Sequence, residues 1–148
     1  GEKYSPEGIE ESLVEKSKYI DQVMLYNNQS AYTTALIVPN REALKRKLSH
    51  LNLTLDTEEG RKAAVKKLEE ELAKYKKGGE FEGMFPERWL PTAFAVLAEP
   101  FTEQNQMINS TMKMVRGKIE KAYAARIDYM YTAEGKQTQN QQNLDALK

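Results

Sequence analysis

The spacing of apolar residues switches between helical and strand-like along the chain, beginning with a helix. Ser5 is a candidate N-cap, Pro6 suits the first helical position, and Ile9 and Leu13 start an apolar stripe at helical spacing. The pattern predicts a first amphipathic helix that ends near Ser17.

Three later segments have the composition of strands. The runs 20–27 and 33–39 are rich in apolar and β-branched residues and are separated by a short polar turn, so an antiparallel pair is the simplest arrangement. The run 92–101 is apolar on both sides of the alternation, as expected for a buried central strand. A second helix is predicted over 41–51. These elements predict a small α+β domain, in which a sheet of about three strands is covered by helices on at least one face.

Two further helices and a tail complete the pattern. Thr57 as N-cap, with two glutamates behind it, predicts an extra charged helix over about 57–77, followed by a pair of glycines. The apolar stripe of this helix is narrow, so we expect it to lie at the periphery. A last helix is predicted over about 112–130, and the Gln- and Asn-rich residues 136–148 are expected to form a disordered tail.

Lys113 occupies an unusual place in this pattern. If Ser110 or Thr111 is the N-cap of the last helix, Lys113 falls in or near its first turn, where the helix dipole disfavours a cation by ~0.3–1 kcal/mol. One interpretation is an exposed lysine whose long stem carries the ammonium away from the dipole. The other is an anion site formed by the ammonium and nearby free N–H groups. The residues alone do not separate the two.

Composition narrows the classes of function. The 148 residues are the length of one domain, and the 22 basic and 22 acidic residues cancel, so no general attraction to nucleic acid is expected. The absence of cysteine excludes disulfides, thiolate metal sites and cysteine nucleophiles, and we predict no metal site. The single histidine, His50, is interpreted as a surface or helix-capping residue. Because neither a signal peptide nor a membrane-spanning run is recognised, a cytoplasmic location is expected.

Charge runs on the predicted helices have an ordinary interpretation. The stretches REALKRK and EELAKYKK are typical of solvated helix faces with ion pairs three or four residues apart. No function is assigned to them at this stage.

Two separated stretches resemble the signatures of a known family. The stretches GEKYSPEGIE and NSTMKMVR are similar to the two signatures of the C-terminal domain of adenylate-forming acyl-CoA synthetases, and residues 1–135 resemble that domain in the long-chain fatty-acid–CoA ligase branch. The first signature has glycine at the place of Gly1, with an isoleucine and a glutamate in register at Ile9 and Glu10. The second usually has Gly-Lys, where this chain has Met112, as in the long-chain branch, and then Lys113.

The resemblance implies roles for named residues. The domain would act as a mobile lid, and Lys113 would be the catalytic lysine of ATP-dependent acyl-adenylate formation, supported in its turn by Thr111 and Arg116. After the domain rotates, a loop would face coenzyme A during transfer of the acyl group. That loop comprises Gly1, Glu2, Lys3, Tyr4 and Ser5.

The resemblance also implies partners. A long-chain fatty-acid–CoA ligase uses a fatty acid, ATP, Mg²⁺ and coenzyme A, and the family's N-terminal domain, which binds ATP and the acid, is not in this sequence. We therefore expect this chain alone to be inactive and to bind none of these cofactors, while the parent enzyme makes peripheral membrane contact. The alternative is a non-catalytic α+β interaction or regulatory module that docks on a partner through helix 57–77.

Overall fold

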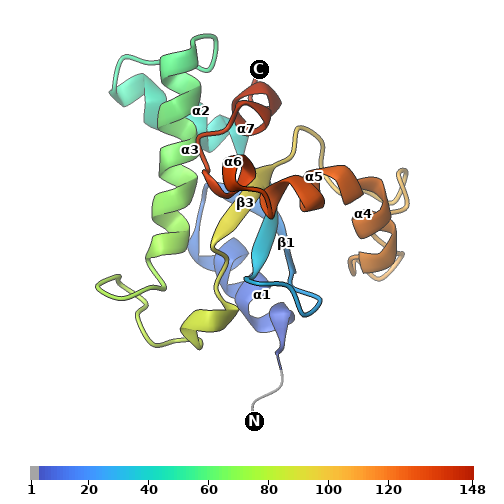
Figure 1. Ribbon diagram of the computed structural model, residues 1–148. Helices are drawn as coiled ribbons and strands as arrows, with labels where there is room; N and C mark the ends of the chain where they lie inside the picture. Colours follow the sequence, from blue (N-terminus) through green and yellow to red (C-terminus); the bar gives the residue numbers. More distant parts are fainter. Residues whose placement is uncertain (1–3) are drawn as a thin grey trace.

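The computed structural model describes residues 4–148, and Figure 1 shows a short central sheet with helices on both sides. The strands are β1 (Ile20–Tyr26), β2 (Thr34–Pro39) and β3 (Ala93–Val96). The helices are α1 (Pro6–Lys16), α2 (Arg41–His50), α3 (Glu58–Ala73), α4 (Arg116–Ala122), α5 (Ala124–Met130), α6 (Ala133–Lys136) and α7 (Gln141–Ala146), with a 3₁₀ turn at Glu87–Trp89. The predicted α+β class with a three-stranded sheet is confirmed.

The sheet has the order β1-β2-β3, so β2 is the central strand. β1 and β2 are antiparallel, as predicted, with Val23 opposite Ile37 and an irregularity between Ile20 and Gln22. β3 pairs parallel to β2 and is therefore an edge strand, although all four of its residues are buried. The prediction that this segment forms a central strand is wrong, because helices cover both its faces and give an edge strand the burial of a central one.

One face of the sheet carries the larger apolar cluster. It gathers side chains from α1, α2, α3 and α7 against alternate strand residues such as Leu25, Ile37 and Phe94. Val65 and Leu68 of α3 are fully buried in this cluster. The prediction that the charged helix is peripheral is therefore wrong: its stripe is narrow, but all of it faces the core, and apart from the buried Glu71 most of its charges lie on the opposite side.

The other face carries a smaller cluster that includes Leu36, Ile119 and Ile127. α4 and α5 cover it, and Figure 1 shows them on the opposite side of the sheet from α3. The predicted continuous helix over 112–130 is instead two short helices, because the chain leaves helical geometry at Tyr123, whose φ and ψ are −111° and 24°.

The tail is ordered, which contradicts the predicted disorder of residues 136–148. α7 packs on β3 and α3, and its Leu144 and the following Leu147 are buried in the larger cluster. Arg41 at the start of α2 donates to the carbonyl of Leu147 at 3.0 Å. The Gln- and Asn-rich composition suggested disorder, but capping by Asn140 and two leucines are enough to fix this segment.

α7 also completes the β3 edge of the sheet. The side-chain amide of Asn143 accepts a hydrogen bond from Val96 N–H (2.8 Å) and donates one to the Phe94 carbonyl (3.0 Å). It thereby satisfies the backbone groups that an unpaired edge strand would otherwise leave buried without partners. Arg126 of α5, from the other face, donates to the same Asn143 oxygen at 3.0 Å.

Candidate functional site

The lysine turn, residues 108–115, is a tight loop held by one asparagine. Ile108 and Met114 form an antiparallel bridge at its base. Asn109 Oδ1 accepts hydrogen bonds from the backbone N–H groups of Thr111 and Lys113, both at 3.0 Å, and from Thr111 Oγ1 at 2.8 Å. The Asn109 N–H donates to the Lys113 carbonyl at 2.9 Å. Asn109 therefore organises the turn, a role that an asparagine before a polar turn can signal but that sequence reasoning missed.

Lys113 lies outside any helix. α4 begins at Arg116, and Val115 holds its N-cap position, so the predicted caps at Ser110 or Thr111 are wrong. Both polar residues instead belong to the turn, where the Asn109 side chain competes successfully with helix formation. The conflict with a helix dipole therefore does not arise, and the ammonium is exposed at the tip of the loop.

Met112 has a backbone conformation that glycine adopts more readily. Its φ of 65° lies in the left-handed region, which residues other than glycine adopt at a cost of about 1–2 kcal/mol. The side chain is 70% exposed, so it gains little from packing. The backbone conformation that brings Lys113 to the loop tip is thus held by the surrounding hydrogen bonds and not by the preference of Met112.

An ion pair joins the two sequence signatures. Glu10 of α1 is only 5% exposed, and both of its carboxylate oxygens accept hydrogen bonds from Arg116, which lies directly after the lysine turn. The Leu25 N–H of β1 donates to the same carboxylate at 2.6 Å. Burial raises the pKa of Glu10, while the bonds from Arg116 and Leu25 oppose that rise. The Glu10 carboxylate in turn raises the pKa of Arg116.

The pair borders an open cleft of about 660 Å³ between α1, β1 and the lysine turn. Lys113 and Arg116 are the cations that line it, beside apolar side chains that include Val14 and Met114. Its five carboxylates are those of Glu7, Glu10, Glu11, Glu15 and Asp21. A cleft with this excess of negative charge does not by itself form a phosphate cradle.

The remaining predicted site residues lie at the start of the chain. Gly1, Glu2 and Lys3 lie outside the described residues. Tyr4 packs edge-on against Trp89 with ring centroids 5.8 Å apart, and burial raises its pKa. Ser5 precedes α1 as predicted, but its side chain bonds Glu7 at 3.4 Å and caps no backbone N–H.

Two further features bear on the kind of site. Within residues 4–148, no group of three or more His, Asp or Glu side chains is placed to hold a metal ion. Of the helices that the structure describes, none combines the length and apolar character needed to cross a bilayer.

Comparison with known proteins gives distant relatives over most of the chain. No protein-family model matches it. Long chain acyl-CoA synthetase 8 of Arabidopsis thaliana is 26% identical over 130 residues, which cover 84% of this chain and 17% of the relative. The chloroplastic long-chain-fatty-acid–[acyl-carrier-protein] ligase AEE15 of the same plant is 25% identical over 132 residues, with 89% and 16% covered. The chain thus spans about a sixth of the length of these curated relatives.

Solved structures share the fold. The adenylation domain of a carboxylate reductase from Mycobacterium chelonae matches with a TM-score of 0.62 and 24% identity, over 82% of this chain and 17% of that one. The A domain of a carboxylic acid reductase from Segniliparus rugosus, solved with AMP and a co-purified carboxylic acid, matches with a TM-score of 0.61 and 23% identity, over 88% and 18%. At this identity the likeness establishes the fold alone.

Proposed function

Since the chain is a relative of the AMP-binding, adenylate-forming acyl-CoA synthetases, we propose that it is the C-terminal lid domain of a long-chain fatty-acid–CoA ligase. The observation that carries the proposal is the Glu10–Arg116 ion pair. It unites in one rigid contact two signature segments that lie 106 residues apart in the sequence. A lid that alternates between two reactions needs this union, because one rotation must withdraw one segment as it presents the other.

The proposed role of Lys113 is electrostatic. When a carboxylate attacks the α-phosphate of ATP, negative charge collects on the phosphate oxygens, and an ammonium placed there stabilises the transition state more than the ground state. Lys113 is exposed at the tip of a loop that is held by Asn109, so it can enter a cleft of a neighbouring domain. Arg116 and Thr111 hold that loop to α1 and to Asn109, respectively.

The nucleotide, Mg²⁺, the fatty acid and coenzyme A are proposed to bind mainly to another domain of a longer protein. The carboxylates around Lys113 disfavour a polyphosphate within this chain alone, and the relatives are several times longer. The segment from Gly1 to Ser5, which leads into α1, is proposed to meet coenzyme A when the lid rotates. The cytoplasmic location and the peripheral membrane contact stay predictions.

Lys113→Ala in the longer protein tests the proposal. We expect acyl-adenylate formation, measured as exchange of pyrophosphate into ATP, to fall by ~10²–10³, the usual loss on removing one such donor. Thioester formation from pre-made acyl-adenylate and coenzyme A should persist, because the rotated lid has withdrawn the lysine. Lys121→Ala is the matched control, since this exposed lysine lies on α4 and away from the cleft lining.

Two outcomes would contradict the role of Lys113. One is near-normal adenylation in the Lys113→Ala variant, and the other is an equal loss of both half-reactions in a variant that remains folded. The alternative of docking through helix 57–77 gains no support, because the apolar side of α3 is already buried against the sheet and α7.

A further inference from the structure

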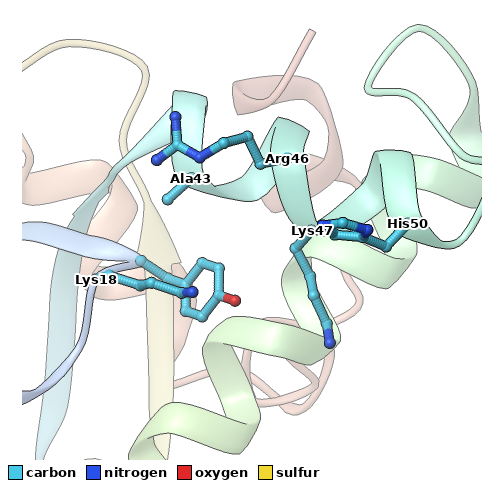
Figure 2. A pocket seen from close by; sticks show the side chains of 6 residues that line it. Lys18, Ala43, Arg46, Lys47 and His50 are labelled. Carbon is cyan, nitrogen blue, oxygen red and sulfur yellow. The ribbon is translucent and has the colours of Figure 1, made fainter.

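A second pocket lies on another part of the molecule, between α2 and the residues that lead into β1. It has a volume of about 240 Å³. Its lining consists of Lys18, Tyr19, Ala43, Arg46, Lys47 and His50, with no carboxylate among them. Figure 2 shows Lys18 on one side of the opening, with Arg46, Lys47 and His50 on α2 around the other. The pocket shares no lining residue with the cleft beside Lys113.

The basic side chains of this pocket lack acidic partners. Among the described residues, neither an ion pair nor a side-chain hydrogen bond engages Arg46, Lys47 or His50, and Lys18 makes only a cation–π contact with the Tyr19 ring, at 5.4 Å. The neighbouring Lys45 behaves differently, since it pairs with Glu42 at 3.4 Å. The ion pairing expected of REALKRK is therefore present at Lys45 and absent at the next two residues, although Arg46 is solvent-exposed as expected.

The pocket is built on fixed backbone. The Asn40 N–H donates to the Tyr19 carbonyl at 2.9 Å, and the Asn40 side chain caps α2 by accepting from Ala43 N–H at 3.1 Å. Tyr19 and Ala43, which line the pocket, are only 7% and 2% exposed. Arg46, Lys47 and His50 follow Ala43 by three, four and seven residues, so they lie on one face of the helix.

Size and charge together select a class of ligand. Pockets for whole drug-sized ligands usually measure about 300–1,000 Å³, so this one suits a single charged group and not a whole nucleotide. The three cations without an acidic partner, Lys18, Arg46 and Lys47, favour a doubly charged anion. The Arg46 guanidinium can recognise phosphate oxygens through paired donors. We propose that this pocket binds the phosphomonoester group of a ligand. The proposal goes beyond the role of Lys113 and does not depend on it.

The experiment titrates the 148-residue chain with methyl phosphate, a monoester that is largely a dianion at neutral pH, and with dimethyl phosphate, a diester monoanion, at matched ionic strength. Amide NMR shifts of residues 18–19 and 43–50 report on binding. We expect saturable shifts with methyl phosphate and weaker or no saturation with the diester. The double variant Arg46→Gln/Lys47→Gln should weaken binding by roughly tenfold or more, while Lys45→Gln should leave it unchanged.

A second arm identifies the source of the phosphomonoester. Cosedimentation compares vesicles of phosphatidylcholine with vesicles that also contain phosphatidic acid. Retention by phosphatidic acid alone, lost in the double variant, assigns a lipid headgroup, and methyl phosphate binding without vesicle retention assigns a soluble ligand. Equal shifts with both esters, or equal affinity in the folded double variant, would overturn the proposal, as would tighter binding of single-stranded RNA than of methyl phosphate.

Discussion

The two edges of the sheet are closed by the same arrangement with different chemistry. At the β1 edge, Glu10 accepts the Leu25 N–H and is held by Arg116 from the other face. At the β3 edge, Asn143 accepts the Val96 N–H and is held by Arg126 from the other face. In each case a buried side chain from the face with the larger core satisfies an edge strand, and an arginine from the opposite face fixes it.

The difference between the edges lies in charge. Glu10 is a carboxylate that can be protonated, whereas the side-chain amide of Asn143 does not titrate. The NH₂ group of that amide also donates to the Phe94 carbonyl. The titratable edge is the one that carries the lysine turn, directly before Arg116. We infer that the neutral β3 edge contributes to stability alone. The charged β1 edge links the candidate site to the protonation state of Glu10.

Asn143→Ala should have the largest effect on stability. It leaves the Val96 N–H and the Phe94 carbonyl buried without partners, and at ~1–3 kcal/mol for each group the free energy of unfolding should fall by roughly 2–6 kcal/mol. Urea denaturation measures this loss. Gln142→Ala is the matched control on the same helix, where an exposed side chain should change stability by less than about 0.5 kcal/mol. Similar losses in the two variants would show that α7 does not close the edge.

Arg116→Ala should have the next largest effect. Removing one partner of a fully buried pair costs about 3–5 kcal/mol, and because 29% of the Arg116 side chain is exposed we expect roughly 2–3 kcal/mol. Hydrogen exchange of residues 109–115 should rise more than exchange in α7. Uniform acceleration across both regions would mean that Arg116 supports the whole fold and not the site edge in particular.

The pH dependence should have the smallest effect and should be confined to the edge that contains Glu10. Burial raises the pKa of Glu10 above 4.5, so its contribution to stability is present below that value and is lost as the pH rises through the folded pKa. The stability of the natural chain relative to Glu10→Gln should therefore decline between acid and neutral pH. Relative to Asn143→Ala it should stay constant. Urea melts at several pH values measure both differences.

Glu71 supplies the opposite sign as an internal control. Its burial acts to raise the pKa, but hydrogen bonds from Ser17 and Lys74, with the charges of Lys74 and Lys67, hold it below 4.5. Its contribution is present above 4.5 and is lost as the pH falls through the folded pKa. A Glu71→Gln series that followed the Glu10→Gln series would contradict the assignment of both shifts.

The sequence predicted the charged edge better than the neutral one. Glu10 belongs to a recognisable signature, whereas Asn143 lies in a Gln- and Asn-rich tail whose composition is typical of disorder. Composition averages over a segment and cannot show that one amide faces two strand groups. The burial of α3 was missed for a similar reason: the width of its apolar stripe was visible, but how much of that stripe other elements would cover was not.

The position of Lys113 shows another limit of prediction from the sequence. The helical spacing after it was real, and α4 and α5 occupy that segment, but the start signal was placed too early. Asn109 captures the N–H groups of Thr111 and Lys113 that a helix would have used differently. Local competition between a side chain and the backbone thus decided the position of the candidate catalytic residue.

The edge arrangement also sets a waiting time during protein synthesis. Val96 emerges from the ribosome 47 residues before Asn143, which at about 5–20 residues per second is a delay of roughly 2–9 s. Arg116 is synthesised 106 residues after Glu10, which at the same rate is a delay of roughly 5–20 s. During the first interval β3 offers unpaired backbone groups to any neighbouring nascent chain, and during the second the Glu10 carboxylate lacks its arginine, so slower translation between Val96 and Asn143 should increase aggregation before it affects the finished protein.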